Sequence, residues 1–220
     1  MDRPKLEPLE IVSGAHSAFV ILRGLASESK FGVIAHQVWI QQLRAAGFEG
    51  SIYQYWWDSS HSVFHYVKVK SRAKEVGRSY LANDLLTLKE PYINIIAHSM
   101  GCRIPYHMLK IWNERNEQHP LQKRLHNCIF LGGHIKRDCS RAWHLFPRYF
   151  FGQLFNCYNP KDKTLKRFHK TVGRLDKSSC GRKPIEYSHS RLINVEINTI
   201  GSSHSQYINV LSNYLFFPKR

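Results

Sequence analysis

Short apolar runs alternate along the chain with stretches whose apolar positions recur at helical spacing. The clear runs are 18–22 (AFVIL), 51–57 (SIYQYWW), 91–96 (PYINII), 128–131 (CIFL), 154–158 (LFNCY) and 192–197 (LINVEI). Short runs rich in β-branched and aromatic residues are typical of strands buried on both faces of a sheet. We therefore predict strands at these six places, with 11–16 as a weaker edge strand.

The intervening stretches predict helices. Residues 32–47 carry apolar side chains on a helical period and end at Gly47, and 67–88 predict a second helix with a basic outer face. A third helix follows residue 101, and 208–216 predict a closing helix. This alternation indicates an α/β protein, with a mostly parallel sheet of six or seven strands flanked by helices. The length favours one domain over 1–220, with a polar leader at 1–10.

Composition narrows the picture through charge and cysteine content. The formal net charge is +16, which favours an anionic partner: nucleic acid, lipid head groups or an acidic protein. The five cysteines are odd in number and form no CxxC pair, so we expect reduced, mostly buried thiols and no zinc site. No run reaches the ~20 apolar residues of a membrane span, and no signal peptide is evident. We expect a cytoplasmic protein, with signal-independent export as the alternative.

The stretch 91–108 is the most informative part of the chain. It predicts a strand, a tight turn and a helix, and the turn reads Ala97-His98-Ser99-Met100-Gly101. This matches the GxSxG nucleophile elbow with alanine in the first glycine position, where small residues let the strand and the helix approach closely. Ser99 is therefore the candidate nucleophile.

At this point the sequence resembles the α/β-hydrolase superfamily, of the serine esterase and lipase type. The resemblance implies an acid and then a histidine after Ser99, each in a turn that follows a strand. Asp162 follows the strand at 154–158, and His204 follows the last strand. It also implies an oxyanion hole made by the N–H of Met100 and a second N–H after the first buried strand, at Leu25 or the adjacent Ala26.

Other residues compete for these roles. Asp138 follows the strand at 128–131 and is the main alternative acid, whereas Asp176 lies deep in a basic stretch and fits less well. His189 precedes the last strand, which places it at the wrong end of the sheet. His61 and His65 lack the glutamate of an HExxH motif, so we expect neither a metal nor a cofactor.

The last ninety residues have a closer resemblance, to the hydrolase domain of uncharacterised transmembrane and coiled-coil domain proteins. The matching residues are Leu131-Gly132-Gly133, Trp143, 156–165 (NCYNPKDKTL) and 201–207 (GSSHSQY). Those proteins end this region in Gly-His-x-x-Tyr, whereas here Ser202 and Ser203 separate Gly201 from His204. Their membrane spans are absent from this sequence.

Two further stretches bear on specificity. Residues 134–153 interleave aromatic and arginine residues, and we consider two alternatives: a small lid or acyl-chain pocket, or an ordinary segment that covers the sheet. Residues 161–183 are the most basic tract, which we expect to be a solvated loop, with attraction of an anionic substrate or bilayer as the second interpretation.

The sequence thus predicts a serine hydrolase that cleaves a carboxylic ester through Ser99, His204 and Asp162, and a lipid or phospholipid ester is the expected substrate. The partners are then a small-molecule or lipid ester and, peripherally, an anionic membrane. The alternative is a non-catalytic basic protein that binds nucleic acid or an acidic surface on a hydrolase-like scaffold.

Overall fold

The computed structural model describes residues 2–24, 32–59, 66–116, 118–138, 142–172, 179–215 and 217, without the side chains of 32–35 and 168–172. Seven strands form one sheet in the order β1-β3-β2-β4-β5-β6-β7. They are β1 (Lys5–Glu10), β2 (Ser17–Leu22), β3 (Ser51–Trp56), β4 (Tyr92–His98), β5 (Leu125–Leu131), β6 (Leu154–Tyr158) and β7 (Leu192–Glu196). Only the β1–β3 pair is antiparallel among the pairs in this sheet. The predicted mostly parallel α/β sheet is confirmed.

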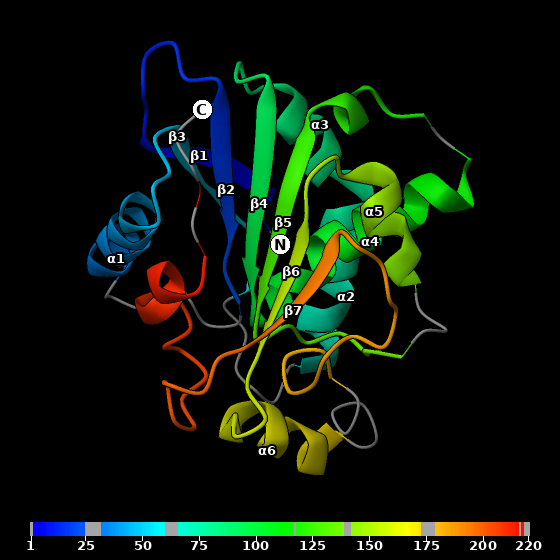
Figure 1. Ribbon diagram of the computed structural model, residues 1–220. Helices are drawn as coiled ribbons and strands as arrows, with labels where there is room; N and C mark the ends of the chain where they lie inside the picture. The colour runs from blue at the N-terminus through cyan, green and yellow to red at the C-terminus, as the bar shows by residue number, and fades with distance from the viewer. Residues whose placement is uncertain are drawn as a thin grey trace.

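Helices cover both faces of the sheet (Figure 1). One face carries α1 (Gly32–Ala45) and the short 3-10 helix η6 (Ile208–Asn213), and the other carries α2 (Tyr66–Ser79), α3 (Leu81–Leu86), α4 (Arg103–Glu114) and α5 (Leu145–Tyr149). The core is divided accordingly, because neighbouring strand residues point to opposite faces: Ile95 belongs to one apolar cluster and Ile96 to the other. This two-sided burial explains why the strands read as continuous apolar runs.

The carboxyl ends of the parallel strands lead into the connections that carry the candidate residues. These connections include the 3-10 helices η2 (Ser99–Cys102) and η4 (Ala142–His144) and the helix α6 (Lys163–Val172), whereas η3 (Pro120–Lys123) precedes β5. Helix α6 lies beyond the strand ends, at the bottom of the view in Figure 1. Part of the basic tract 161–183 is therefore helical, and the expectation of a simple loop was wrong there.

The amino-terminal expectation was also wrong. The edge strand is β1, inside the segment that we took for a polar leader, and 11–16 contains a turn at Gly14 with a φ of +71°. Strand β1 pairs only with β3 in the sheet, so its unpaired edge tolerates Pro8, and its side chains are only partly buried. Polar residues can therefore form this strand, while Ile11 remains 57% exposed.

The helix predicted at 67–88 is two helices, α2 and α3, which meet at Tyr80. Its basic face is not wholly solvated, since the Arg72 side chain is 5% exposed, pairs with Glu75 at 3.0 Å and donates a hydrogen bond to the backbone of Asp2. The closing helix is shorter than predicted, because the regular turns of η6 end at Asn213.

The segment 134–153 packs on the sheet in its described part. Trp143, Phe146 and Phe150 are at most 1% exposed and belong to the core cluster that includes α4, whereas Phe151 is 63% exposed. Most of the aromatic residues of this segment therefore fill the core, and Phe151 is the exception.

Four cysteines fit the expectation of buried thiols: Cys102, Cys128, Cys157 and Cys180 are free and buried, and burial raises the pKa of each. Cys139 lies outside the described residues. Among the described helices, none has the length and apolar character needed to cross a bilayer.

Helices α2 and α4 approach closely at Gly77. A Cβ atom there would lie 2.2 Å from the backbone oxygen of Ile104, so α2 would have to move. We predict that Gly77→Ala lowers the free energy of unfolding by about 2 kcal/mol or more, because overpacking by about 3 kcal/mol outweighs the ~1 kcal/mol gain in helix propensity. Urea unfolding measures this change. Ser71→Ala, at an exposed position of α2, is the matched control, and equal stability of the two variants would contradict the prediction.

Candidate functional site

The site is built around the turn that follows β4. Ser99 has a φ of 56°, which is uncommon for a residue other than glycine and agrees with a strained elbow. The turn lies against the end of β2: a Cβ atom on Gly101 would lie 2.5 Å from the Leu22 oxygen, and one on Gly24 would lie 2.8 Å from the Ser99 Cβ. Glycine at both positions is therefore required by the close approach of two backbones. Ala97, in the position where the motif usually has glycine, is fully buried between β2 and β5.

Asp162 is fixed by the helix that it begins. Its Oδ1 accepts a hydrogen bond from the backbone N–H of Leu165 at 2.9 Å, which is the bond of an N-cap residue to the third residue of α6. The preceding Asn159 accepts from the Lys161 N–H at 2.9 Å and so closes the turn after β6. The Asp162 side chain is 0% exposed. A buried carboxylate is thus placed just after the strand, by local turn and cap chemistry.

His204 connects this carboxylate with the serine. Its Nδ1 lies 2.6 Å from Asp162 Oδ2, and its Nε2 lies 2.7 Å from Ser99 Oγ. Because the carboxylate can only accept, Nδ1–H donates to it and Nε2 is left to accept from the serine hydroxyl. The structure therefore brings together the three side chains singled out in the sequence, although His204 lies 105 residues after Ser99 and 42 residues after Asp162.

Of the residues that compete for these roles, the structure describes Asp138 and His189. The partner of His204 Nδ1 is Asp162, and not Asp138. His189 precedes β7, and its Nδ1 accepts a hydrogen bond from the Arg191 N–H at 3.1 Å. Asp176, His61 and His65 lie outside the described residues.

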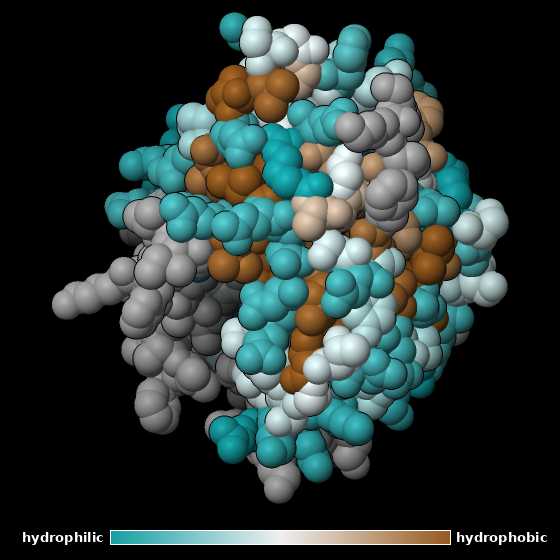
Figure 2. All heavy atoms as spheres, turned by 60° about the vertical axis from the view of Figure 1, so that its left-hand side comes forward, coloured by the Kyte–Doolittle hydropathy of each residue, from teal (hydrophilic) through white to brown (hydrophobic). Residues whose placement is uncertain are grey.

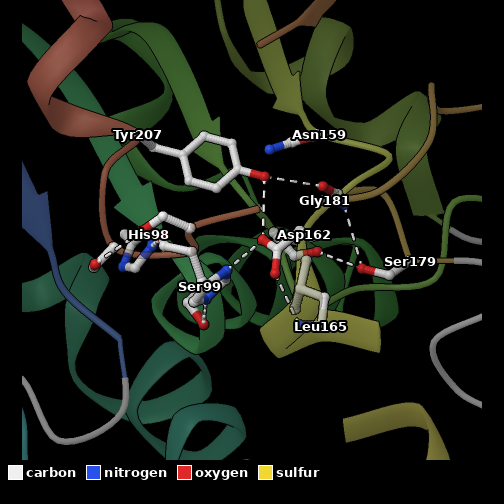
Figure 3. Close-up of polar contacts among 12 residues, drawn as sticks. His98, Ser99, Asn159, Asp162, Leu165, Ser179, Gly181 and Tyr207 are labelled. Atoms are coloured by element: carbon white, nitrogen blue, oxygen red, sulfur yellow. Dashed lines mark hydrogen bonds and ion pairs between the residues drawn. The ribbon is translucent and has the colours of Figure 1, made fainter. Parts of the chain in front are cut away.

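Two residues around His204 were not assigned a role from the sequence (Figure 3). His98 donates from Nε2 to the backbone oxygen of His204 at 2.9 Å, and the two rings lie 4.7 Å apart. Tyr207 places its hydroxyl 3.3 Å from Asp162 Oδ2. Asn159 also donates to the Gly201 oxygen at 2.8 Å and holds the other end of the same loop. His98 lies in the elbow motif and Tyr207 in the motif around His204, but the sequence does not indicate which residues their side chains contact.

Burial, followed by the neighbouring His204, lowers the pKa of His98 to about 3. His98 is therefore neutral at ordinary pH, and its proton sits on Nε2 for the bond to the His204 oxygen. The ring directly before the serine thus acts as a fixed donor that holds the loop of His204.

The expected oxyanion donors are described only in part. Met100 follows Ser99 in η2, which continues into the twelve residues of α4, so its N–H belongs to the amino end of a helical segment where the dipole favours negative charge. Leu25 and Ala26 lie outside the described residues, directly after Gly24. Within the described part of the chain, no group of three or more His, Cys, Asp or Glu side chains could hold a metal ion.

Comparison with known families identifies the chain. A family model described as "Protein of unknown function (DUF726)" matches residues 61–216, which include Ser99, Asp162 and His204. The chain belongs to the DUF726 family. No curated protein matches this DUF726 protein at a significant level.

Solved structures resemble this DUF726 protein at low sequence identity. The acyl-protein thioesterase 2 of Zea mays is 14% identical over 97% of this chain and 97% of its own, with a TM-score of 0.51. Esterase 2 of Thermogutta terrifontis, in its apo form, is 13% identical over 98% and 92%, with a TM-score of 0.49. Alpha/beta hydrolase domain-containing protein 10 from mouse is 10% identical over 97% and 94%, with a TM-score of 0.48. The sheet order and the maize match give the DUF726 protein the α/β-hydrolase fold, as the resemblance in sequence implied.

The lowered pKa of His98 makes the stability of the protein depend on pH. A histidine whose folded pKa lies below its ordinary value of 6.5 takes up its proton first in the unfolded chain, so its contribution to stability is complete above pH 6.5 and is lost as the pH falls toward 3. We predict that His98→Gln, which keeps a side-chain donor, reduces the loss of unfolding free energy between pH 6.5 and pH 4.5 by up to about 1.4 kcal/mol per pH unit. Urea unfolding at several pH values measures the slope. His16→Gln, at an exposed position, is the control, and identical slopes for His98→Gln and wild type would contradict the prediction.

Proposed function

We propose that this protein is a serine hydrolase that cleaves a carboxylic ester through an acyl-enzyme. The observation that supports the proposal is the hydrogen-bonded line from Asp162 through His204 to Ser99. Asp162 Oδ2 accepts from His204 Nδ1, and His204 Nε2 accepts from the Ser99 hydroxyl. A serine hydroxyl is hardly ionised at neutral pH, so it needs a base within hydrogen-bonding distance and a group that orients the base.

In the proposed reaction, Ser99 Oγ attacks the carbonyl carbon while His204 Nε2 takes the hydroxyl proton. Asp162 keeps the imidazole in the required tautomer and stabilises the imidazolium. The N–H of Met100 and that of Leu25 bind the oxyanion of the tetrahedral intermediate. His204 then gives its proton to the departing alcohol, and a water molecule, activated by the same base, releases the acid and regenerates Ser99.

The proposed substrate is a lipid-type ester. Three lysines support an anionic substrate or surface: Lys161, Lys163 and Lys166 are exposed in the turn and helix that directly surround Asp162. Hydrophobic residues appear only as separate patches on the face drawn in Figure 2, which otherwise consists mostly of hydrophilic residues. Charge, therefore, is the feature that would bring a lipid head group to this edge. Thioesters and amides would use the same residues.

The second candidate function is non-catalytic binding to nucleic acid or an acidic surface, which the net charge of +16 favours. Such a protein would bind arbitrary DNA with steep salt dependence and would hydrolyse no ester. Turnover of short p-nitrophenyl esters together with weak DNA binding would instead favour the hydrolase.

The nucleophile can be tested by covalent labelling. We predict that a fluorophosphonate probe labels the wild-type protein and that Ser99→Ala abolishes labelling and lowers kcat for a p-nitrophenyl ester by at least about 10⁴-fold. Gel fluorescence and initial rates measure the two effects. Ser205→Ala, at an exposed position beside His204, is the matched control. Equal labelling of Ser99→Ala and wild type would rule out Ser99 as the nucleophile.

Asp162→Asn separates the proposed chemistry from helix capping in the same experiment. Asparagine is as good an N-cap as aspartate, so α6 should be retained. The amide can donate to His204 Nδ1 and favour the wrong tautomer, so we expect kcat to fall by roughly 10³- to 10⁴-fold. Circular dichroism checks the fold, and full activity in a folded variant would remove Asp162 from the mechanism.

The lipid proposal makes a separate prediction about charge. Replacing Lys163 and Lys166 with glutamine should weaken binding to phosphatidylglycerol vesicles by up to about 30-fold, at ~1 kcal/mol per basic residue near the surface, while binding to phosphatidylcholine vesicles stays weak. Vesicle co-sedimentation measures this effect. The control pair is Lys89 and Lys123, exposed near the amino ends of β4 and β5. If both pairs reduce binding equally, the net charge alone is responsible.

A further inference from the structure

Tyr207 is the last residue of the motif around His204, and the proposed reaction does not use it. Its side chain is 1% exposed, and its hydroxyl lies 3.3 Å from Asp162 Oδ2 and 3.2 Å from the backbone oxygen of Gly181 (Figure 3). The Asp162 oxygen that faces Tyr207 is the one that receives His204 Nδ1. Tyr207 therefore donates a hydrogen bond to the same carboxylate oxygen that contacts His204.

Gly132 provides the space that Tyr207 occupies. Its φ is +56°, and a Cβ atom there would lie 2.8 Å from Tyr207 Cε2 and 3.2 Å from His204 Cε1. A side chain at this position would therefore displace both rings. This contact gives a physical reason for glycine at the carboxyl end of β5, next to Leu131.

The second acceptor of Tyr207 is held rigidly by backbone contacts. The Gly181 oxygen also accepts from the Asn159 N–H at 2.9 Å, and the Gly181 N–H donates to the Gly133 oxygen at 2.9 Å. A Cβ atom on Gly181 would lie 2.4 Å from the Gly132 carbonyl carbon, so this approach also needs glycine. The Tyr207 hydroxyl is thus anchored between Asp162, in the turn after β6, and Gly181, whose own backbone is bonded to the turn after β5.

The protonation state of Tyr207 makes it a permanent donor. Burial and then the charge of Asp162 raise the pKa of Tyr207 far above its ordinary value. Its single proton is shared between the Gly181 oxygen and the Asp162 carboxylate. A hydrogen bond from a neutral donor withdraws charge from a carboxylate, and the carboxylate then stabilises a neighbouring imidazolium less strongly.

We propose that Tyr207 is a positioning residue that fixes Asp162 Oδ2 against His204 and moderates the charge that the imidazole experiences. This inference rests on the proposed hydrolase function for its kinetic consequence, but the contact can be tested without turnover. Among the described residues, the other titratable or charged groups that face this cluster are the His98 ring, the Arg23 charge acting on His98, and the buried thiols of Cys157 and Cys180 beside Tyr207.

Tyr207→Phe removes the hydroxyl and keeps the ring over Gly132. We expect kcat for a p-nitrophenyl ester to fall by about tenfold, because Asp162 Oδ2 is no longer held in place against His204. KM should change less than about twofold, because the proposed reaction gives Tyr207 no contact with the substrate. The acidic limb of the kcat/KM profile should move to higher pH by several tenths of a unit, since His204 then protonates more readily. Tyr55→Phe is the matched control: Tyr55 is 0% exposed, its hydroxyl donates to Asp84 Oδ2 at 2.6 Å, and its strand β3 is separated from β4 by β2 in the sheet. The control should lose stability without moving the limb.

An NMR titration of the His204 ring distinguishes failure of this inference from failure of the proposed function. Its signal, assigned with His204→Gln, should titrate at higher pH in Tyr207→Phe than in wild type, whether or not the protein hydrolyses any ester. If Tyr207→Phe does not fold, 3,5-difluorotyrosine at position 207 replaces it; this stronger donor should shift the midpoint to lower pH. An unchanged midpoint in the folded variant would overturn the inference. A shifted midpoint without wild-type turnover would retain the Tyr207 contact and reject the hydrolase.

Discussion

The arrangement depends on how closely backbones approach one another at the carboxyl edge of the sheet. The turn at Ser99 lies against the end of β2. The neighbouring atoms leave no room for a side chain at position 24 or 101, which are both glycine, and Ser99 itself has a positive φ. Such a conformation costs about 1 to 3 kcal/mol and persists only where the surrounding structure enforces it. The buried parallel strands β2, β4 and β5 supply that enforcement, because their pairing fixes the positions of both turns.

The buried carboxylate is stabilised by the groups that also place it. Taking an ionised carboxylate out of water is costly unless donors replace the lost water. Asp162 has three of them: the Leu165 N–H, the Tyr207 hydroxyl and the ring of His204. One is a helix cap, so folding of α6 and placement of the acid are the same local event. The acid is consequently rigid before any substrate arrives, which is what a group that orients a histidine requires.

The fold and the site contribute different kinds of support to the function. Many unrelated activities use the same α/β scaffold, and structures at 14% identity establish only that scaffold. The proposed hydrolysis rests on the atoms at the edge of the sheet: a hydroxyl, an imidazole and a carboxylate form one hydrogen-bonded line. The exposed Lys163 and Lys166 add an electrostatic preference for anionic partners, which the buried side chains of the hydrogen-bonded line do not provide. The proposed reaction and the proposed preference for an anionic partner thus rest on separate parts of the molecule.

The sequence by itself determined the sheet, the elbow and the candidate nucleophile, because apolar periodicity and small-residue turns are local signals. It also indicated Asp162 and His204, since each follows a strand whose carboxyl end must lie at the same edge. It failed where stability comes from pairing rather than composition: β1 is polar and was taken for a leader, and Arg72 is charged yet buried. Only the tertiary structure decided which acid meets His204, and only it revealed His98, Tyr207 and Gly132 as the neighbours of that histidine. Contacts between residues so distant in the chain depend on the spacing and twist of the whole sheet, and no local pattern encodes those quantities.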